Sequence, residues 1–275
     1  MNGAVNDGYR AATRARRDVA GPLRRGFTLL ELVVVIGIVM ALAAILTVTL
    51  PDLFTSAHNA TLVTNLKEID DMVQTWANTH RGVYPNGWDS LVTSAGEFYQ
   101  FLPRISPANP CGTYFKPTEL KDHHVRRLRR AGITTVCHMT YDGTSSDAQN
   151  ATLLASDVAN PTTIASGMTL LFANVTGSMA GNKMQFDKTH DYVVFGVGRG
   201  TDLVGGTGLI KDQPVIIHTQ GCTSPQTTYC APAVIFDLGP ATTTEGRDNF
   251  VAQYVGSVAL AEGLFLFSEE KTTMY

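Results

Sequence analysis

The chain has 275 residues, 44% of them hydrophobic, and a formal net charge of −3. This length suits one large domain or two smaller ones, and the hydrophobic content is that of a folded protein with a core, which excludes a wholly disordered chain. The charge is divided unevenly, because the first 26 residues carry six arginines and two aspartates, a net +4, and the rest carries −7. Lys and Arg beside a membrane segment stay in the cytoplasm, so this division favours a short cytoplasmic end and a larger exported part.

An apolar segment follows the basic end and runs from Phe27 to Leu50 with one charged residue, Glu31. As an α-helix these 24 residues measure about 36 Å, which is enough to cross a bilayer. A carboxylate inside such a segment is costly unless it finds a partner, so Glu31 marks a functional position.

Three interpretations of this segment compete. The first is an ordinary secretory signal cleaved at the small residues Ala41 to Ala43, and the second is an uncleaved single-helix anchor. The third is a signal cut on the cytoplasmic side, after Gly26. Only the third interpretation gives Glu31 a partner, because cleavage after Gly26 creates a new amine at Phe27, and that cation can pair with Glu31 of a neighbouring subunit.

Residues 24–46, RRGFTLLELVVVIGIVMALAAIL, resemble the N-terminal signal of type IV pilins and of type II secretion pseudopilins. The resemblance implies that a prepilin peptidase removes residues 1–26 as a cytoplasmic leader and N-methylates Phe27, and that Glu31 acts in assembly. It implies a single-pass protein of the bacterial inner membrane, with its head in the periplasm or outside, that moves to a surface filament after assembly. The implied partners are copies of itself or other pilins, the peptidase, an inner-membrane assembly platform, and lipid before assembly.

The next segment, 51–80, is expected to extend the same helix as an amphipathic half. Its apolar residues recur at helical steps of three and four and form one stripe: Leu62, Leu66, Ile69, Val73 and Trp76. Pro51 lacks a backbone donor and is expected to kink or loosen the helix. Several turn residues from Gly82 to Gly87 predict that the helix ends near Arg81. Tyr84 is expected to pack back on the helix.

The middle of the chain, 93–165, reads as mixed and loop-rich, with one helix predicted over 119–131. This helix carries Arg126, Arg127, Arg129 and Arg130. Such a cluster could bind the phosphates of DNA. The alternatives are that it forms a basic face in contact with solvent, or that it contacts an acidic surface of another subunit. Adjacent histidines on a helix, here His123 and His124, point about 100° apart, so no metal site is expected from them.

Short β-rich runs follow in the C-terminal half, and turn residues separate them. The runs are 168–175, 191–198, 214–219, 233–238, 250–260 and 263–268. They predict an antiparallel sheet packed on one face. The expected fold is therefore α+β: a long N-terminal helix, with a transmembrane half (27–50) and an amphipathic half (51–80), and a globular head over 81–275.

Four cysteines all lie beyond the apolar segment: Cys111, Cys137, Cys222 and Cys230. In an exported domain they can form two disulfides in three ways. Cys111–Cys137 and Cys222–Cys230 are favoured because each closes a short loop, and reduced buried thiols are the alternative.

No cofactor, metal site or enzymatic activity is expected, because the chain shows no G-x-S-x-G, H-E-x-x-H or C-x-x-C pattern. Pseudopilins often hold calcium in a C-terminal loop, and Asp142, Asp147, Asp187 and Asp191 offer oxygen ligands here, although no residue maps onto that loop. The leading function is a structural filament subunit. The alternatives are a low-abundance minor pilin with an adhesive or ligand-binding tip head, and a signal-directed periplasmic protein.

Overall fold

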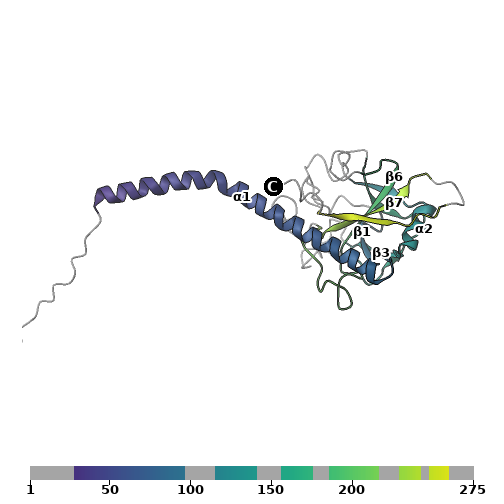
Figure 1. The fold of residues 1–275 in the computed structure, drawn as a ribbon. Coiled ribbons are helices and arrows are strands. Elements are labelled where there is room, and N and C mark those ends of the chain that lie inside the picture. The colour runs from purple at the N-terminus through teal and green to yellow at the C-terminus, as the bar shows by residue number, and fades with distance from the viewer. Residues whose placement is uncertain are drawn as a thin grey trace, which may run out of the picture. The chain divides into compact units, whose positions relative to one another are not determined.

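The structure is a computed structural model that describes residues 28–96, 115–140, 156–175, 186–216, 229–242 and 248–259, with the side chains of 46–59 left out of the description (Figure 1). The chain divides into two compact units, residues 1–53 and 54–275. Each unit is described by itself below. The α+β class is confirmed, because an N-terminal helix precedes a head built on a mixed, largely antiparallel sheet.

Helix α1 spans Leu29–Thr79, and its C-terminal end belongs to the head. Arg81 adopts a left-handed φ of 60°, and the N–H of Gly82 donates to the carbonyl of Ala77 at 2.7 Å. These features close the last turn of the helix, as a left-handed cap does. The predicted end near Arg81 is confirmed.

The amphipathic stripe of α1 forms part of the head's core. Leu62, Leu66, Ile69 and Val73 are each at most 4% exposed. Ile69 and Val73 join the main core, while Leu62 and Leu66 pack with Ile216 and Ala259 in a second cluster. The hydroxyl of Ser257 donates to the carbonyl of Leu66 at 2.8 Å and so ties the last strand to the helix.

Within the described residues, eight strands form one sheet. They are β1 (Trp88–Thr93), β2 (Phe115–Glu119), β3 (Thr135–Met139), β4 (Thr162–Thr163), β5 (Thr169–Ala173), β6 (His190–Gly196), β7 (Ala233–Pro240) and β8 (Gln253–Val258). The order is β2-β5-β6-β1-β3-β4, and β7 pairs with both β6 and β8. β1 and β3 run parallel, and the other pairs are antiparallel.

Sequence explains where strands sit in this sheet. β6 and β7 are nearly continuous apolar runs and are buried along most of their length, as interior strands are. β2 carries Pro117, which cannot donate to a ladder, and it lies at one end of the sheet order with mostly exposed residues. Trp88, Phe115, Phe172, Phe195 and Phe236 fill the core and are fully buried.

Most predicted elements of the head are present. Helix α2 spans Asp122–Arg130 inside the predicted 119–131. β5 and β8 lie inside predicted runs, and β6 and β7 overlap two others, starting one residue early at His190 and ending two residues late at Pro240. Residues 214–216 form no strand, so the prediction was wrong there, and 217–219 and 263–268 lie outside the described residues.

Tyr84 has further partners beyond the predicted contact with the helix. Its ring meets Phe236 of β7 edge-on at 5.2 Å, and its hydroxyl accepts a hydrogen bond from the N–H of Tyr254 at 3.3 Å. The side chain therefore anchors the turn after α1 to strands β7 and β8, and it packs against the core cluster to which Ile69 and Val73 of α1 belong.

Candidate functional site

The N-terminal motif begins α1 with a reciprocal cap. The Glu31 N–H donates to Thr28 Oγ1 at 3.2 Å, and the Thr28 N–H donates to Glu31 Oε2 at 2.9 Å. The Thr28 hydroxyl adds a third bond, to Glu31 Oε2 at 3.0 Å. A Thr followed three residues later by Glu is a capping box, which satisfies donors that the first helical turn leaves open. Gly26 and Phe27 lie outside the described residues.

This cap fixes the Glu31 carboxylate at the first turn of the helix. Both bonds to the carboxylate come from Thr28 and end on Oε2. Among the described residues no other donor bonds to this carboxylate, so Oε1 remains to accept a further donor. Local sequence alone holds the acid in place, since both partners belong to one helical turn.

The rest of the first helical unit presents an apolar surface. Twelve large hydrophobic side chains between 29 and 45 are 44–81% exposed: Leu29, Leu30, Leu32, Val33, Val34, Val35, Ile36, Ile38, Val39, Met40, Leu42 and Ile45. Because residues 32–36 are consecutive, this surface covers every face of the helix, as in a helix surrounded by apolar material. Within the described residues, no helix is both long and apolar enough to cross a membrane. The predicted segment 27–50 extends past the side chains described.

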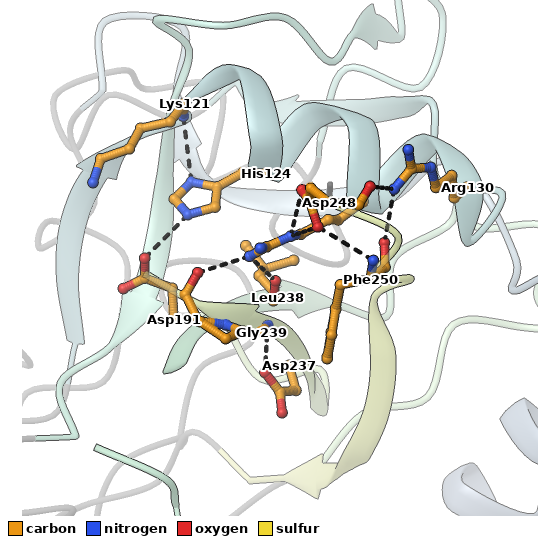
Figure 2. A network of polar contacts seen from close by, with 11 residues as sticks. Lys121, His124, Arg130, Asp191, Asp237, Leu238, Gly239, Asp248 and Phe250 are labelled. Atoms are coloured by element: carbon orange, nitrogen blue, oxygen red, sulfur yellow. Dashed lines mark hydrogen bonds and ion pairs between the residues drawn. The ribbon is translucent and has the colours of Figure 1, made fainter. Parts of the chain in front are cut away.

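In the head, the basic helix α2 is held by internal contacts (Figure 2). Arg127 is 2% exposed, and its Nε donates to both carboxylate oxygens of Asp248, at 3.0 and 2.9 Å. Its Nη1 donates to the carbonyl of Pro240 at 2.9 Å. Burial by itself raises the pKa of Asp248, but the bonds from Arg127 and the N–H of Phe250 outweigh it and hold that pKa below its ordinary value.

Two further arginines of α2 also bind the chain itself. Arg130 donates to the backbone carbonyls of Asp248 and Phe250, and Arg129 donates to the carbonyl of Ile164 at 2.8 Å. Three of the four arginines therefore fasten α2 to neighbouring segments, and Arg126 is exposed. Most of the arginine cluster therefore serves to hold α2 in place. Binding of the cluster to DNA stays a prediction.

The cysteines differ from the expected pairing. Cys137 is a free, buried thiol, and its Sγ lies 3.7 Å from the carbonyl oxygen of Gly87, to which it donates. The favoured Cys111–Cys137 disulfide is therefore wrong, because β3 buries this side chain against the segment that enters β1. Cys230 is disulfide-bonded. Cys111 and Cys222 lie outside the described residues, so Cys222–Cys230 stays a prediction.

The acidic residues suggested for calcium separate into different places. Asp142 and Asp147 lie outside the described residues. Asp187 accepts hydrogen bonds from the N–H and hydroxyl of Thr189, at 2.9 and 2.7 Å, and Asp191 pairs with His124 at 3.0 Å.

Asp191 therefore lies with the adjacent histidines of α2, a grouping that the sequence analysis missed. Asp191 follows His124 by 67 residues, and no spacing rule connects them.

Residues 22–47 match the family model of the prokaryotic N-terminal methylation motif, which marks type IV pilin- and pseudopilin-like proteins. This confirms the resemblance predicted from residues 24–46. No curated protein and no solved structure matches the chain.

Proposed function

We propose that this pilin-like chain is a structural subunit of a type IV pilus-like filament or of a type II secretion pseudopilus, assembled from the inner membrane after processing. One observation carries the proposal: the methylation motif of residues 22–47 coincides with the start of a helix whose apolar surface is exposed on every face. A motif of this kind points to a structural protein rather than to an enzyme.

In this proposal, the peptidase hydrolyses the Gly26–Phe27 bond and methylates the new amine of Phe27. The apolar helix holds the chain in the inner membrane, and the head lies in the periplasm. On assembly the helix leaves the lipid and packs against helices of neighbouring subunits. Since lipid tails and apolar side chains are alike in polarity, the helix loses little hydrophobic stabilisation in this exchange.

Glu31 sets the register between subunits in this scheme. Its Oε2 accepts the hydrogen bonds from Thr28 that cap the start of the helix. Its Oε1 is free to accept a hydrogen bond from the Phe27 amine of a neighbouring subunit. An acid left unpaired in an apolar filament core costs about 3–5 kcal/mol, so subunits that slip along the axis are disfavoured.

Processing provides the first test. Intact-mass measurement and N-terminal sequencing of the mature protein are expected to find methylated Phe27 as the first residue. Gly26→Ala, or a bulkier change there, is expected to leave residues 1–26 attached. A mature chain that begins near Ala44 would show ordinary secretion instead and would exclude the proposal.

Assembly provides the second test, with Thr28→Ala as the matched control for Glu31→Ala. Both variants lose side-chain bonds of the cap, but only Glu31→Ala loses the carboxylate. Both are expected in the membrane fraction, while filaments sheared from cells contain the Thr28 variant and lack the Glu31 variant. Equal recovery of both variants in filaments would contradict the pairing of Glu31 with an amine.

A minor subunit with an adhesive or ligand-binding tip head is the second candidate. The predicted head spans 81–275, which is larger than many major subunits need. Counting copies along immunolabelled filaments separates the two roles. A continuous label indicates a major subunit, and a label confined to filament ends indicates a tip subunit.

A further inference from the structure

Two histidines and one aspartate meet where the first turn of α2 faces β6. His123 and His124 are adjacent on α2, and Asp191 is the second residue of β6. One ligand atom from each of the three side chains lies within 4.8 Å of the other two. The closest pair is His124 Nε2 and Asp191 Oδ2, at 3.0 Å, which Figure 2 shows.

Among the described residues, the Nε2 of His123 has no hydrogen-bond partner, and the residue is only 8% exposed. Leaving a buried polar group unsatisfied costs about 1–3 kcal/mol, so such groups call for an explanation. Burial, together with the neighbouring His124, Arg127 and Lys121, lowers the pKa of His123 to about 4. The ring is therefore neutral at neutral pH, which is the form of histidine that binds metals.

We propose that His123, His124 and Asp191 bind one divalent transition-metal ion, with Zn²⁺ as the best match. Two imidazole nitrogens and one carboxylate oxygen form a donor set that suits zinc, whereas calcium and magnesium prefer oxygen ligands alone. Three protein ligands leave a fourth tetrahedral position for water.

The geometry needs only a small adjustment to hold the ion. With bonds of about 2.0–2.1 Å, tetrahedral ligands lie roughly 3.4 Å apart. The separations here are at most 4.8 Å, so the ligand atoms need to approach one another by at most about 1.4 Å to reach that spacing. The rings of His123 and His124 already lie 4.1 Å apart, centroid to centroid. The ring of Phe172 lies 5.5 Å from that of His124 and forms an apolar wall.

Two features of the surroundings oppose metal binding at this site, and the effect of each is modest. The first is a hydrogen bond: the backbone N–H of Lys121 donates to Nδ1 of His124 at 3.3 Å. A metal bound at Nε2 requires the ring proton to sit on Nδ1, and a protonated Nδ1 cannot accept this long bond. Of the charges near His123, Lys121 and Arg127 are positive and Asp248 is negative. Asp248 already pairs with Arg127, and the exposed Lys121 ammonium also interacts electrostatically with the Asp191 carboxylate.

A metal here would join α2 to β6 independently of the Arg127–Asp248 pair. We expect the full-length chain, purified in detergent without a histidine tag and stripped with a chelator, to bind one Zn²⁺ by calorimetry. Its thermal unfolding temperature is expected to rise with Zn²⁺. Co²⁺ in place of Zn²⁺ is expected to give the visible absorption bands of a tetrahedral ion.

The variants His123→Gln and Asp191→Asn are expected to lower the Zn²⁺ affinity by at least about a hundred-fold, because each removes a ligand rather than an outer partner. His190→Gln is the matched control, because His190 is also partly buried and pairs with Asp237 at 2.9 Å. The Zn²⁺ affinity of His190→Gln is expected to match that of the wild type. Circular dichroism of the metal-free variants checks folding, and Asp191→Asn carries the test if His123→Gln does not fold. The proposal is overturned if the wild type binds no stoichiometric Zn²⁺, if both ligand variants retain its affinity, or if only His190→Gln loses it.

Discussion

Replacing the buried Asp89 by Asn is expected to remove a pH dependence from the free energy of unfolding of the head. Asp89 lies on β1 and is 1% exposed, and its Oδ2 accepts the hydroxyl of Tyr229 at 2.8 Å. Oδ1 is buried and has no hydrogen-bond partner in the part of the chain that the structure describes. Burial raises the pKa of Asp89 from 3.8 to about 6, against the opposing effect of hydrogen bonds with Ser156 and Tyr229.

The magnitude follows from linkage between proton binding and folding. Between pH 3.8 and about 6 the folded state keeps a proton on Asp89 that the unfolded state releases. The free energy of unfolding therefore falls as pH rises through this range, by about 3 kcal/mol at 1.36 kcal/mol per pH unit, and the loss is complete above pH 6. An Asn side chain does not titrate and still offers an oxygen to the hydroxyl of Tyr229.

The assay is urea denaturation of the wild type and Asp89→Asn, as full-length chains in detergent, at several pH values from 4 to 7. The free energy of unfolding of the variant minus that of the wild type is expected to increase by about 2.4 kcal/mol between pH 4 and pH 7, because the remainder of the effect lies below pH 4. Other titrating groups are shared by both proteins and cancel in this difference. A difference that stays constant with pH would refute the assignment of a raised pKa to Asp89.

Two further predictions concern the head. Arg127→Ala leaves Asp248 buried without its partner, so it is expected to lower the free energy of unfolding by about 3–5 kcal/mol, while Arg126→Ala at the exposed surface changes it by less than about 0.5 kcal/mol. Equal urea midpoints for the two variants would contradict a structural role for Arg127. Cys137 is expected to resist alkylation until the chain unfolds, because it is buried and burial raises the pKa of its thiol to about 11. Mass spectrometry that finds Cys137 modified in the folded protein would show that the thiol is accessible.

Features governed by near neighbours could be predicted from the sequence. The stripe through Leu66 and Val73 follows from helical periodicity, and the strands at β6 and β7 follow from short apolar runs between turns. Helix α2 follows in the same way. Residues 214–216 of the predicted run 214–219 form no strand, because a short apolar run does not reveal whether another strand is beside it to pair with.

Contacts between distant segments could not be predicted in this way. Arg127 and Asp248 are 121 residues apart, and each alone resembles an ordinary surface charge. The parallel pairing of β1 with β3 buries Cys137 beside Gly87 and keeps it a free thiol, although loop length favoured a disulfide to Cys111. Tyr84 likewise packs on strands far along the chain.

The sequence by itself determined the N-terminal motif, the apolar helix and the cap between Thr28 and Glu31, because each depends on residues within a few helical turns. Only the tertiary structure decided that His123 and His124 meet Asp191, that the buried Arg127 pairs with Asp248, and that Arg129 and Arg130 bind backbone carbonyls of other segments. The physical reason is that a side chain's partners, burial and pKa depend on which strands the sheet brings beside it, and sequence spacing does not encode that choice.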